Sequence, residues 1–549
     1  MEVVVKQNSK NKFGQYFTPK VVADFMVGLA ETSTSSVQRI SANSKILEPS
    51  CGEGVFLETL QQKGYNNLDA FEIDPDLATN FPFVCYESFV SANIDDKFDL
   101  IIGNPPYIRW KNLEDKLKQE LSTNPIWNKY FNSLCDYLYI FILKSIELLN
   151  ENGQLIFICP EYWMNTTHSI SLRNYMVQNG YFEEIYHFNE TPIFDKVTVS
   201  IVIFKFIKSK QKTGKTCTER SRSIKVVKFY ANQRLTAEIL ENLQNQIPLK
   251  DAEYLQVSHF KTNERWLLQS DEVKEELQQL EIVCQKQNPT SLLSFFDEEK
   301  TEFHTIGEIC DIGNGLVSGL DKAFQVNGYE LNRAEKSATI NVVKAKDLTP
   351  FFAQRITKYI FINYRLEESE LQKIYPNFYT HFQKYKTDLE KRYQYNRKIN
   401  YWEWVFLRNF NLFSKVEQRI FVPCKERISN KDYFRFALVE GRVFPTQDVT
   451  AIFRKSGTKE SIEYILAYLN QAIIFDWLKC NGIVKGNIVE FSEKPIASIP
   501  FKKIDWNNKN EILLHNSITD LTRQFLTNKD KKLLSKINTL FNQLFEIKR

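Results

Sequence analysis

The chain has 549 residues, of which 43% are hydrophobic and 25% charged, the composition of a globular protein with two to four domains. The longest apolar stretch, residues 137–149, is too short for a membrane span, and the N-terminus lacks the apolar core of a signal peptide, so we expect a cytoplasmic protein without a membrane partner. The nine cysteines and six histidines are scattered without ligand spacing, so neither a disulfide framework nor a metal site is predicted.

Residues 1–206 alternate short apolar runs with amphipathic stretches of ten or more residues. The predicted strands are 45–48, 68–73, 99–103, 154–159 and 197–206, and the predicted helices include 20–31 and 133–149. Pro19 suits the first position of the earlier helix, after a Thr18 cap. This alternation indicates an open α/β sheet, a fold that binds ligands at the carboxyl ends of its strands.

The first strand leads into a turn with two glycines, Glu48-Pro-Ser-Cys-Gly-Glu-Gly54, and then into a helix. Gly52 and Gly54 let the backbone approach a ligand, and the helix N-terminus presents free N–H groups. Glu72 ends the second strand, where an acidic residue in such folds accepts hydrogen bonds from ribose hydroxyls. The third glycine of the dinucleotide fingerprint is missing, which disfavours NAD and leaves another nucleoside as the ligand.

The fourth strand ends in Asn104-Pro-Pro-Tyr107, which predicts a catalytic site formed by Asn104, Pro105, Pro106 and Tyr107. The Asn104 carboxamide oxygen and the Pro105 carbonyl oxygen are two rigid acceptors that can bind both hydrogens of an NH₂ group and favour a pyramidal nitrogen during methylation. Tyr107 offers a flat face on which a base can stack. Such a site works mainly by positioning. The alternative is a Pro-Pro turn that closes a strand.

The βαβ pattern ends near residue 290, and the second half contains a basic segment. Residues 341–440 contain 19 Lys and Arg against 11 Asp and Glu, with 22 aromatic residues, although the whole chain carries a net charge of only +4. A basic, aromatic-rich segment is typical of a nucleic-acid surface. A tyrosine-rich core with solvated lysines explains the same counts equally well.

Four segments carry a family resemblance: Gly14-Gln-Tyr-Phe-Thr-Pro19, Glu48-Pro-Ser-Cys-Gly-Glu-Gly54, Glu72-Ile-Asp74 and Asn104-Pro-Pro-Tyr107. Together they resemble the gamma-class amino-methyltransferases of restriction–modification systems, above all the TaqI-type adenine-N6 DNA methyltransferases. The resemblance covers residues 13–206. It implies a Rossmann-like S-adenosylmethionine-dependent methyltransferase domain at 1–235. A helical connection would follow at 236–290, and a mixed α+β target-recognition domain with C-terminal helices at 291–549.

The resemblance also implies how the cofactor S-adenosylmethionine is held. The residues concerned are Thr18, Glu48, Gly52, Gly54, Glu72, Ile73 and Phe89. Thr18 would hold the amino-acid end of the cofactor, Glu48 and the turn would surround its methionine moiety, and Glu72 would bind the ribose. Ile73 and Phe89 would contact the adenine ring. The sequence departs from the family at Ser88, where an acidic residue for the adenine amino group is expected; Glu87 stands one place early.

For the target base, the resemblance implies that Asn104 and Pro105 bind the amino group and that Tyr107 and Phe194 sandwich the flipped base. A core phenylalanine is the alternative for Phe194. Double-stranded DNA is the implied substrate, and a cognate restriction endonuclease is a possible functional partner. The candidate DNA-binding residues are Arg392, Arg397, Lys398, Arg427 and Arg435, with Arg355 and Lys391 as further candidates. Each of these can also be a plain surface charge.

Three alternatives remain open from the sequence. A protein-glutamine, RNA or cytosine-N4 methyltransferase presents the same kind of planar amino group to the site. A fused restriction enzyme is disfavoured because no carboxylate–carboxylate–lysine constellation is evident. A DNA-binding protein with a relic cofactor fold is disfavoured because Glu72 and Asn104-Pro-Pro-Tyr107 are intact.

Overall fold

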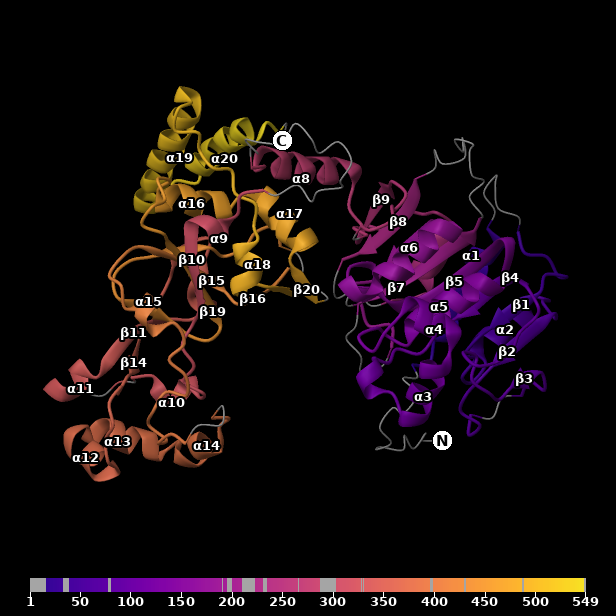
Figure 1. The fold of residues 1–549 in the computed structure, drawn as a ribbon, viewed down its shortest axis with the longest axis horizontal. Coiled ribbons are helices and arrows are strands. Elements are labelled where there is room, and N and C mark those ends of the chain that lie inside the picture. The colour runs from indigo at the N-terminus through magenta and orange to yellow at the C-terminus, as the bar shows by residue number, and fades with distance from the viewer. Residues whose placement is uncertain are drawn as a thin grey trace. The chain divides into compact units, whose positions relative to one another are not determined.

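The computed structural model describes residues 16–547, apart from 33–38, 78–79, 190, 195–199, 210–222, 231–234, 265, 287–302, 327, 329, 395–397, 429–430 and 486–487. The chain divides into two compact units, Met1–Asp271 and Glu272–Arg549 (Figure 1). No helix among the described residues combines the length and the apolar character that a membrane span needs.

The first unit is built around one sheet, in which nine strands of the described chain lie in the order β3-β2-β1-β4-β5-β7-β6-β8-β9 (Figure 1). The strands are β1 (Ile46–Glu48), β2 (Leu68–Phe71), β3 (Val84–Cys85), β4 (Phe98–Gly103), β5 (Leu149–Pro160), β6 (Gly180–His187), β7 (Ile201–Lys208), β8 (Ile224–Phe229) and β9 (Ala252–Val257). The helices are α1 (Lys20–Glu31), α2 (Val55–Gln62), α3 (Asp115–Thr123), α4 (Pro125–Tyr130), α5 (Leu138–Leu148), α6 (Ile170–Asn179) and α7 (Ala237–Gln244).

Strands β3, β2, β1, β4 and β5 are parallel, whereas β7 runs antiparallel between β5 and β6. The parallel strands therefore end at one edge of the sheet, and the segments that follow β1, β2, β3 and β4 meet there. This is the Rossmann-like α/β fold that the sequence predicts, so the fold class of the first unit is confirmed.

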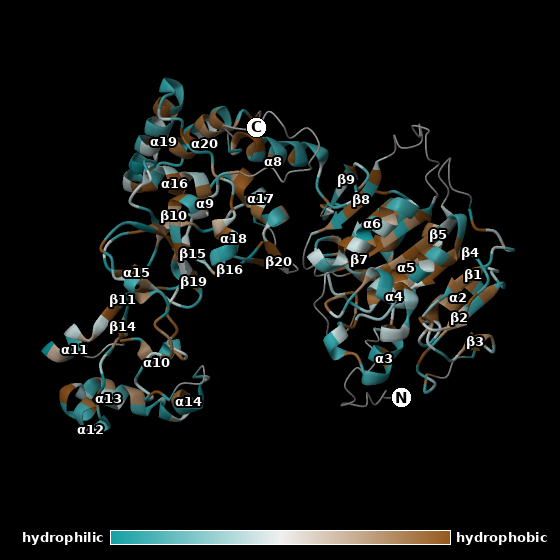
Figure 2. Ribbon diagram, in the orientation of Figure 1, coloured by the Kyte–Doolittle hydropathy of each residue, from teal (hydrophilic) through white to brown (hydrophobic). Residues whose placement is uncertain are grey.

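Both faces of the sheet are covered by helices, which explains why its strands read as continuous apolar runs. Along β5, Leu155 and Phe157 pack with the helices α5 and α6, whereas Ile156 and Ile158 pack with α1, α2 and α7. The hydrophobic colouring of the strands follows this burial (Figure 2). The sheet is thereby a rigid layer that fixes the residues at its carboxyl edge.

Several predicted elements agree with the structure and others are corrected. The helix α1 has the predicted bounds, but Pro19 is its N-cap rather than its first residue, and Thr18 bonds Asn104 instead of capping the helix. The later predicted helix begins at Leu138, not at 133. The helical prediction for 236–290 is wrong at Ala252–Val257, because β9 pairs with β8 and extends the sheet. The first unit therefore continues to Asp271, past the predicted boundary at 235.

The second unit has a mixed α+β architecture, as predicted, with its described strands in three sheets: β10-β19-β15-β17-β13-β12, β14-β11-β18 and β16-β21-β20. Its strands are β10 (Cys310–Asn314), β11 (Thr339–Val343), β12 (Leu348–Thr349), β13 (Phe351–Ala353), β14 (Thr357–Ile360), β15 (Arg419–Pro423), β16 (Lys425–Arg427), β17 (Ala437–Val439), β18 (Val443–Pro445), β19 (Val449–Arg454), β20 (Ile483–Lys485) and β21 (Ile488–Glu490).

Helices surround these sheets. They are α8 (Asp271–Val283), α9 (Ile306–Ile309), α10 (Asp321–Phe324), α11 (Arg333–Ser337), α12 (Glu368–Ile374), α13 (Pro376–Gln383), α14 (Lys386–Lys391), α15 (Phe410–Phe413), α16 (Ile462–Leu469), α17 (Ala472–Asn481), α18 (Glu493–Ala497), α19 (Lys509–Asn528) and α20 (Lys532–Phe545). The aromatic residues of 341–440 largely fill the core: Tyr359, Phe361, Phe378, Trp402 and Trp404 are all buried. The aromatic count of this segment therefore has a structural explanation.

Candidate active site

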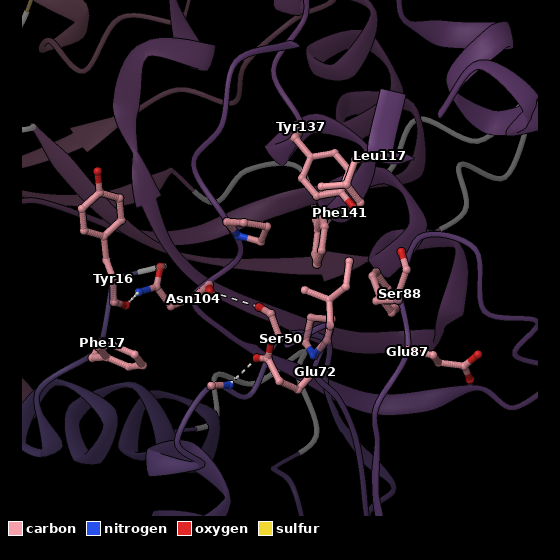
Figure 3. A pocket seen from close by; sticks show the side chains of 15 residues that line it. Tyr16, Phe17, Ser50, Glu72, Glu87, Ser88, Asn104, Leu117, Tyr137 and Phe141 are labelled. Atoms are coloured by element: carbon pink, nitrogen blue, oxygen red, sulfur yellow. Dashed lines mark hydrogen bonds between the residues drawn. The ribbon is translucent and has the colours of Figure 1, made fainter. Parts of the chain in front are cut away.

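An open pocket lies at the carboxyl edge of the parallel strands and encloses about 640 Å³. Its lining comes from the segments after β1, β2, β3 and β4, from the start of α1 and from α3 and α5: Tyr16, Phe17, Pro49, Ser50, Gly52, Glu72, Ile73, Glu87, Ser88, Phe89, Asn104, Pro106, Leu117, Tyr137 and Phe141. Figure 3 shows Tyr16 and Asn104 at one end and Tyr137, Phe141 and Ser88 at the other. The structure thus gathers the sequence-predicted residues of four separate segments.

The glycine turn after β1 is held by Glu72. Gly52 and Gly54 both have positive φ, at +54° and +85°, and a side chain at Gly54 would collide with the Phe81 ring. The Gly52 N–H donates to Glu72 Oε2 over 2.8 Å, and the Asp74 N–H donates to Glu72 Oε1 over 2.9 Å. Burial raises the pKa of Glu72, although these hydrogen bonds act in the opposite direction. Both oxygens are thereby fixed in place.

Glu48, at the end of β1, is 1% exposed. Its Oε2 atom is buried and has no hydrogen-bond partner in the described part of the chain. Burial, and next the nearby Glu72 charge, raise the pKa of Glu48 well above its usual value. A buried carboxylate oxygen without a partner is costly, which indicates that a ligand or a proton completes this site.

Asn104, at the end of β4, forms the most connected part of the site. Its Nδ2 donates to the Tyr16 carbonyl oxygen over 2.7 Å and to Thr18 Oγ1 over 3.1 Å. Its Oδ1 accepts a hydrogen bond from the Tyr107 hydroxyl, which also lies 2.9 Å from the Ile158 carbonyl oxygen. These contacts tie the N-terminal segment to the carboxyl edge of the sheet and fix the plane of the carboxamide.

Three aromatic rings stand beside Asn104. The Tyr16 and Tyr107 rings are stacked, with centroids 5.3 Å apart and planes at 25°. The Phe194 ring lies 5.7 Å from Tyr16 and 6.4 Å from Tyr107. Phe194 is buried, and Pro105 is buried next to Asn104. The residues 195–199, which follow Phe194, are outside the described part of the chain.

The other end of the pocket is built around Phe89, after β3. Its ring packs against Phe141 of α5 at 5.2 Å, and the buried Lys144 donates to the carbonyl oxygens of Phe89, Val90 and Ala92. Ser88 donates to Glu120 Oε1 of α3 over 2.5 Å.

The sequence interpretation missed three pocket residues on or next to α3 and α5, which are Leu117, Tyr137 and Phe141. It also missed Glu120 of α3, which bonds Ser88. These residues belong to amphipathic helices whose apolar spacing is also that of ordinary core residues. Ser50, whose hydroxyl donates to the Asn104 carbonyl oxygen over 3.1 Å, was also missed, although it lies within the glycine turn.

In the second unit, the candidate DNA-binding residues differ in their surroundings. The Arg392 guanidinium donates to the carbonyl oxygens of Ser318, Asn400 and Glu403, and burial lowers its pKa to about 10. Arg435 pairs with the buried Glu426 and donates to the carbonyl oxygens of Ala345 and Leu348. The structure therefore gives Arg392 and Arg435 contacts within the fold, and their role in DNA binding stays a prediction.

The other three candidates are Arg397, Lys398 and Arg427. Lys398 is exposed. Arg427, the last residue of β16, is also exposed. Arg397 lies outside the described residues. Of the further candidates, Arg355 and Lys391 are exposed.

Comparison with known proteins agrees with this geometry. The family model described as Eco57I restriction-modification methylase matches residues 37–194. Type II methyltransferase M.HindII of Haemophilus influenzae is 45% identical over 538 residues, and Type II methyltransferase M.HincII of Haemophilus influenzae is 42% identical over 538 residues; each alignment covers 98% of both chains.

Among solved structures, the Type IIL restriction-modification enzyme MmeI in complex with DNA has a similar fold, with a TM-score of 0.55 and 11% sequence identity. The alignment covers 92% of this chain and 71% of that chain. The whole-length similarity to M.HindII decides the family, because so high an identity extends through both units. The chain belongs to the Type II methyltransferases of restriction–modification systems, and its cofactor is S-adenosylmethionine.

Proposed function

We propose that this methyltransferase transfers a methyl group to the N6 amino group of adenine in duplex DNA, after the adenine has left the base stack. The orientation of the Asn104 carboxamide carries the proposal. The Tyr16 carbonyl oxygen can only accept a hydrogen bond, so the amide nitrogen of Asn104 must face it. The carboxamide oxygen is then presented as an acceptor on the opposite side, next to the aromatic rings.

An exocyclic amine of a base is a weak nucleophile because its lone pair is conjugated with the ring. Acceptors at Asn104 Oδ1 and at the Pro105 carbonyl oxygen bind the two N–H groups, favour a pyramidal nitrogen and aim its lone pair at the methyl carbon. Bound S-adenosylmethionine supplies this methyl group on an electrophilic sulfonium. The N–C bond forms as the C–S bond breaks, and the methylated nitrogen then loses one proton to water. Most of the catalysis is positioning.

The pocket residues fit the cofactor. Glu48 has a buried carboxylate oxygen without a described partner, and the ammonium group of the methionine moiety is a suitable partner for it. Thr18 accepts from Asn104 through Oγ1, so its hydroxyl hydrogen can donate to the carboxylate of the same moiety. Gly52 lines the pocket, where the missing side chain lets a ligand approach the backbone, and Gly54 completes the turn. We assign the amino-acid end of the cofactor to these residues.

The remainder of the cofactor is assigned to the other half of the pocket. Glu72 is held by two backbone N–H groups and retains lone pairs for the ribose hydroxyls. Ile73 and Phe89 line the apolar slot next to it, where the adenine ring would lie.

The target base is assigned to the space beside Tyr107 and Phe194. Their rings face a common region with Tyr16, which contacts both. A base that stacks on Tyr107 therefore displaces the Tyr16 ring or uses it as a third wall. Stacking of about 1–3 kcal/mol per aromatic contact offsets part of the free energy of base flipping.

We assign the reading of the DNA sequence to the second unit, as its target-recognition domain. The similarity of fold to the DNA-bound MmeI enzyme extends over 92% of the chain and supports this assignment. Lys398 and Arg427 are exposed and remain the candidate contacts to DNA. A restriction endonuclease of the same specificity is the proposed functional partner, because the family belongs to restriction–modification systems.

The test uses purified protein, duplex DNA of mixed sequence and S-adenosylmethionine with an isotopically labelled methyl group. The DNA is digested to nucleosides, and the label is located by mass spectrometry. Label in N6-methyladenine is the expected result. Label in N4-methylcytosine retains the mechanism and overturns the choice of base, whereas label only in protein glutamine or in RNA overturns DNA as the substrate.

A further inference from the structure

The end of the pocket far from Asn104 is a narrow apolar slot with a polar wall. Ile73, Phe89, Leu117 and Phe141 supply the apolar lining. Figure 3 shows Leu117 and Phe141 at this end of the pocket. A flat purine fits between such side chains, but the exocyclic amine of adenine needs an acceptor inside the slot, because burying an unpaired donor is costly. The polar groups at this end therefore decide how the adenine ring of S-adenosylmethionine is recognised.

Ser88 is the polar residue of this wall, and it does not act alone. Its hydroxyl donates its single hydrogen to Glu120 Oε1 over 2.5 Å. This leaves the lone pairs of the Ser88 oxygen as acceptors, one of which the neighbouring Tyr137 hydroxyl can use. A serine hydroxyl by itself can turn either way, so the carboxylate behind it fixes it as an acceptor.

The neighbouring Glu87 does not replace this pair. Glu87 is exposed, and Figure 3 shows its carboxylate directed away from Phe141 and Tyr137. Glu120 comes instead from α3, 32 positions later in the chain, and is half-buried behind Ser88. Glu87 lines the pocket, but the acidic group that bonds Ser88 is supplied by a different element of the fold.

Two other titratable side chains lie near Glu120, those of Lys144 and Tyr137. The buried Lys144 has a pKa lowered to about 8 by burial, and the strongest opposing influence is the negative charge of Glu120. Burial, and next the Glu120 charge, raise the pKa of Tyr137, which lines the same wall. Tyr137 is therefore neutral at ordinary pH, and its side chain also bonds Ser88.

We propose that Ser88, oriented by Glu120, accepts a hydrogen bond of the exocyclic amino group on the cofactor's adenine. Ser88 contacts the amine, and Glu120 holds the Ser88 hydroxyl from α3. The pair selects adenine over a purine with a carbonyl oxygen at the same place, because that oxygen would face an acceptor. This assignment concerns the cofactor and holds whichever base or substrate receives the methyl group.

The experiment measures binding to the full-length protein by calorimetry. The two probes are S-adenosylhomocysteine and S-inosylhomocysteine, which carries a carbonyl oxygen in place of the amine. Glu120→Gln should weaken S-adenosylhomocysteine binding about tenfold and reduce the preference over S-inosylhomocysteine by a similar factor, since a charged hydrogen-bond acceptor is lost. Ser88→Ala should weaken binding in the same direction, and the double variant Ser88→Asp with Glu120→Gln should recover most of the loss.

Asp115→Asn is the matched control, because it removes an acid from an exposed position of the same helix. Its affinity should equal that of the unmodified protein. Thermal unfolding of each variant identifies any loss of fold. The proposal is overturned if Glu120→Gln keeps both affinities, if both probes lose affinity equally, or if Glu87→Gln causes the loss instead. Failure of the DNA labelling experiment would leave these binding results unchanged, so the two proposals fail separately.

Discussion

The two units use buried charge in different ways. In the first unit, Glu48 keeps a buried carboxylate oxygen without a partner among the described residues, next to an open pocket. In the second unit, the buried guanidinium of Arg419 donates to the carbonyl oxygens of Phe413, Lys415, Glu417 and Val443. A buried acceptor without a partner beside a pocket indicates a ligand site. A buried cation whose N–H groups donate to backbone carbonyl oxygens has a structural role. The residue type alone does not distinguish these cases.

The largest expected effect follows from removal of the acceptor at the target amine. Asn104→Ala should lower the methyl-transfer rate about 10³-fold, because the lost interaction strengthens as the nitrogen becomes pyramidal. Binding of S-adenosylhomocysteine should remain within a few-fold. Single-turnover kinetics with labelled cofactor measure the first quantity and calorimetry measures the second. Asn104→Asp keeps one acceptor but opposes the Tyr16 carbonyl, so an intermediate rate is expected.

An unchanged transfer rate in Asn104→Ala would remove Asn104 from the reaction. A loss of cofactor binding equal to the loss of rate would instead assign it to the cofactor site.

Glu48 provides the next test, because its open oxygen is assigned to the cofactor. Glu48→Gln removes the carboxylate that would pair with the ammonium group of the ligand and should weaken S-adenosylhomocysteine binding about 10- to 100-fold, the loss of a charged hydrogen bond. The same change should raise the stability of the protein without ligand, since an uncompensated buried acid disappears. Calorimetry and chemical unfolding measure the two effects. Lower stability together with unchanged S-adenosylhomocysteine binding would show that Glu48 has a structural role and does not bind the cofactor.

Arg392, like Arg419, donates to backbone carbonyl oxygens, so it tests whether such a cation has a structural role. Arg392→Ala leaves three backbone carbonyls without their donor and should lower the free energy of unfolding by about 2 kcal/mol. Below the unfolding temperature of the variant, the dependence of DNA binding on salt should be unchanged. The exposed Lys398 is the matched contrast: Lys398→Ala should keep stability and lower the salt slope by about one unit if this residue contacts a phosphate. If Arg392→Ala instead kept the stability and lowered the salt slope, Arg392 would be assigned to the DNA-binding surface.

Much of the first unit could be predicted from its sequence, because its chemistry lies in short local motifs. The turn of Gly52 and Gly54, the acid at Glu72 and the run from Asn104 to Tyr107 each follow a strand, so the fold alone brings them to one edge. Glu120 could not be predicted in the same way. It reaches Ser88 from a helix 32 positions away, and the local pattern of α3 is that of any amphipathic helix.

The basic segment of the second unit shows the opposite limit. This segment is rich in arginine and lysine, but the count does not show how each side chain is bonded. Arg392 and Arg435 are held within the fold by backbone carbonyls and by Glu426. Composition does not show which cations keep free donors. The helical interpretation of 252–257 failed for a related reason, because pairing with β8 overrides the local pattern of β9.

A substitution of Asp136 should affect function less than the substitutions of Asn104, Glu48, Arg392 and Lys398. It gives a specific prediction for stability. It is buried, like Glu48, but both of its oxygens are bonded: Tyr162 donates to Oδ2 over 2.6 Å and the Leu138 N–H donates to Oδ1 over 3.1 Å. Burial nevertheless raises the pKa of Asp136 to about 6. In the unfolded chain an aspartate has a pKa of about 3.9.

The folded state therefore keeps a proton on Asp136 that the unfolded chain has already released between about pH 4 and pH 6. The free energy of unfolding should fall by about 3 kcal/mol as the pH rises through this window and stay constant above it, as far as this group is concerned. Asp136→Asn removes the titration, so unfolding curves in denaturant should show the variant gaining on the unmodified protein from pH 4 to pH 6. Parallel stability curves would show that Asp136 is charged in the fold. Asp136 lies beside the catalytic segment, because the Tyr137 N–H bonds the Ile108 carbonyl oxygen just after Tyr107. Both Asp136 oxygens have partners within the fold, whereas Glu48 Oε2 has none among the described residues and is assigned to the ligand.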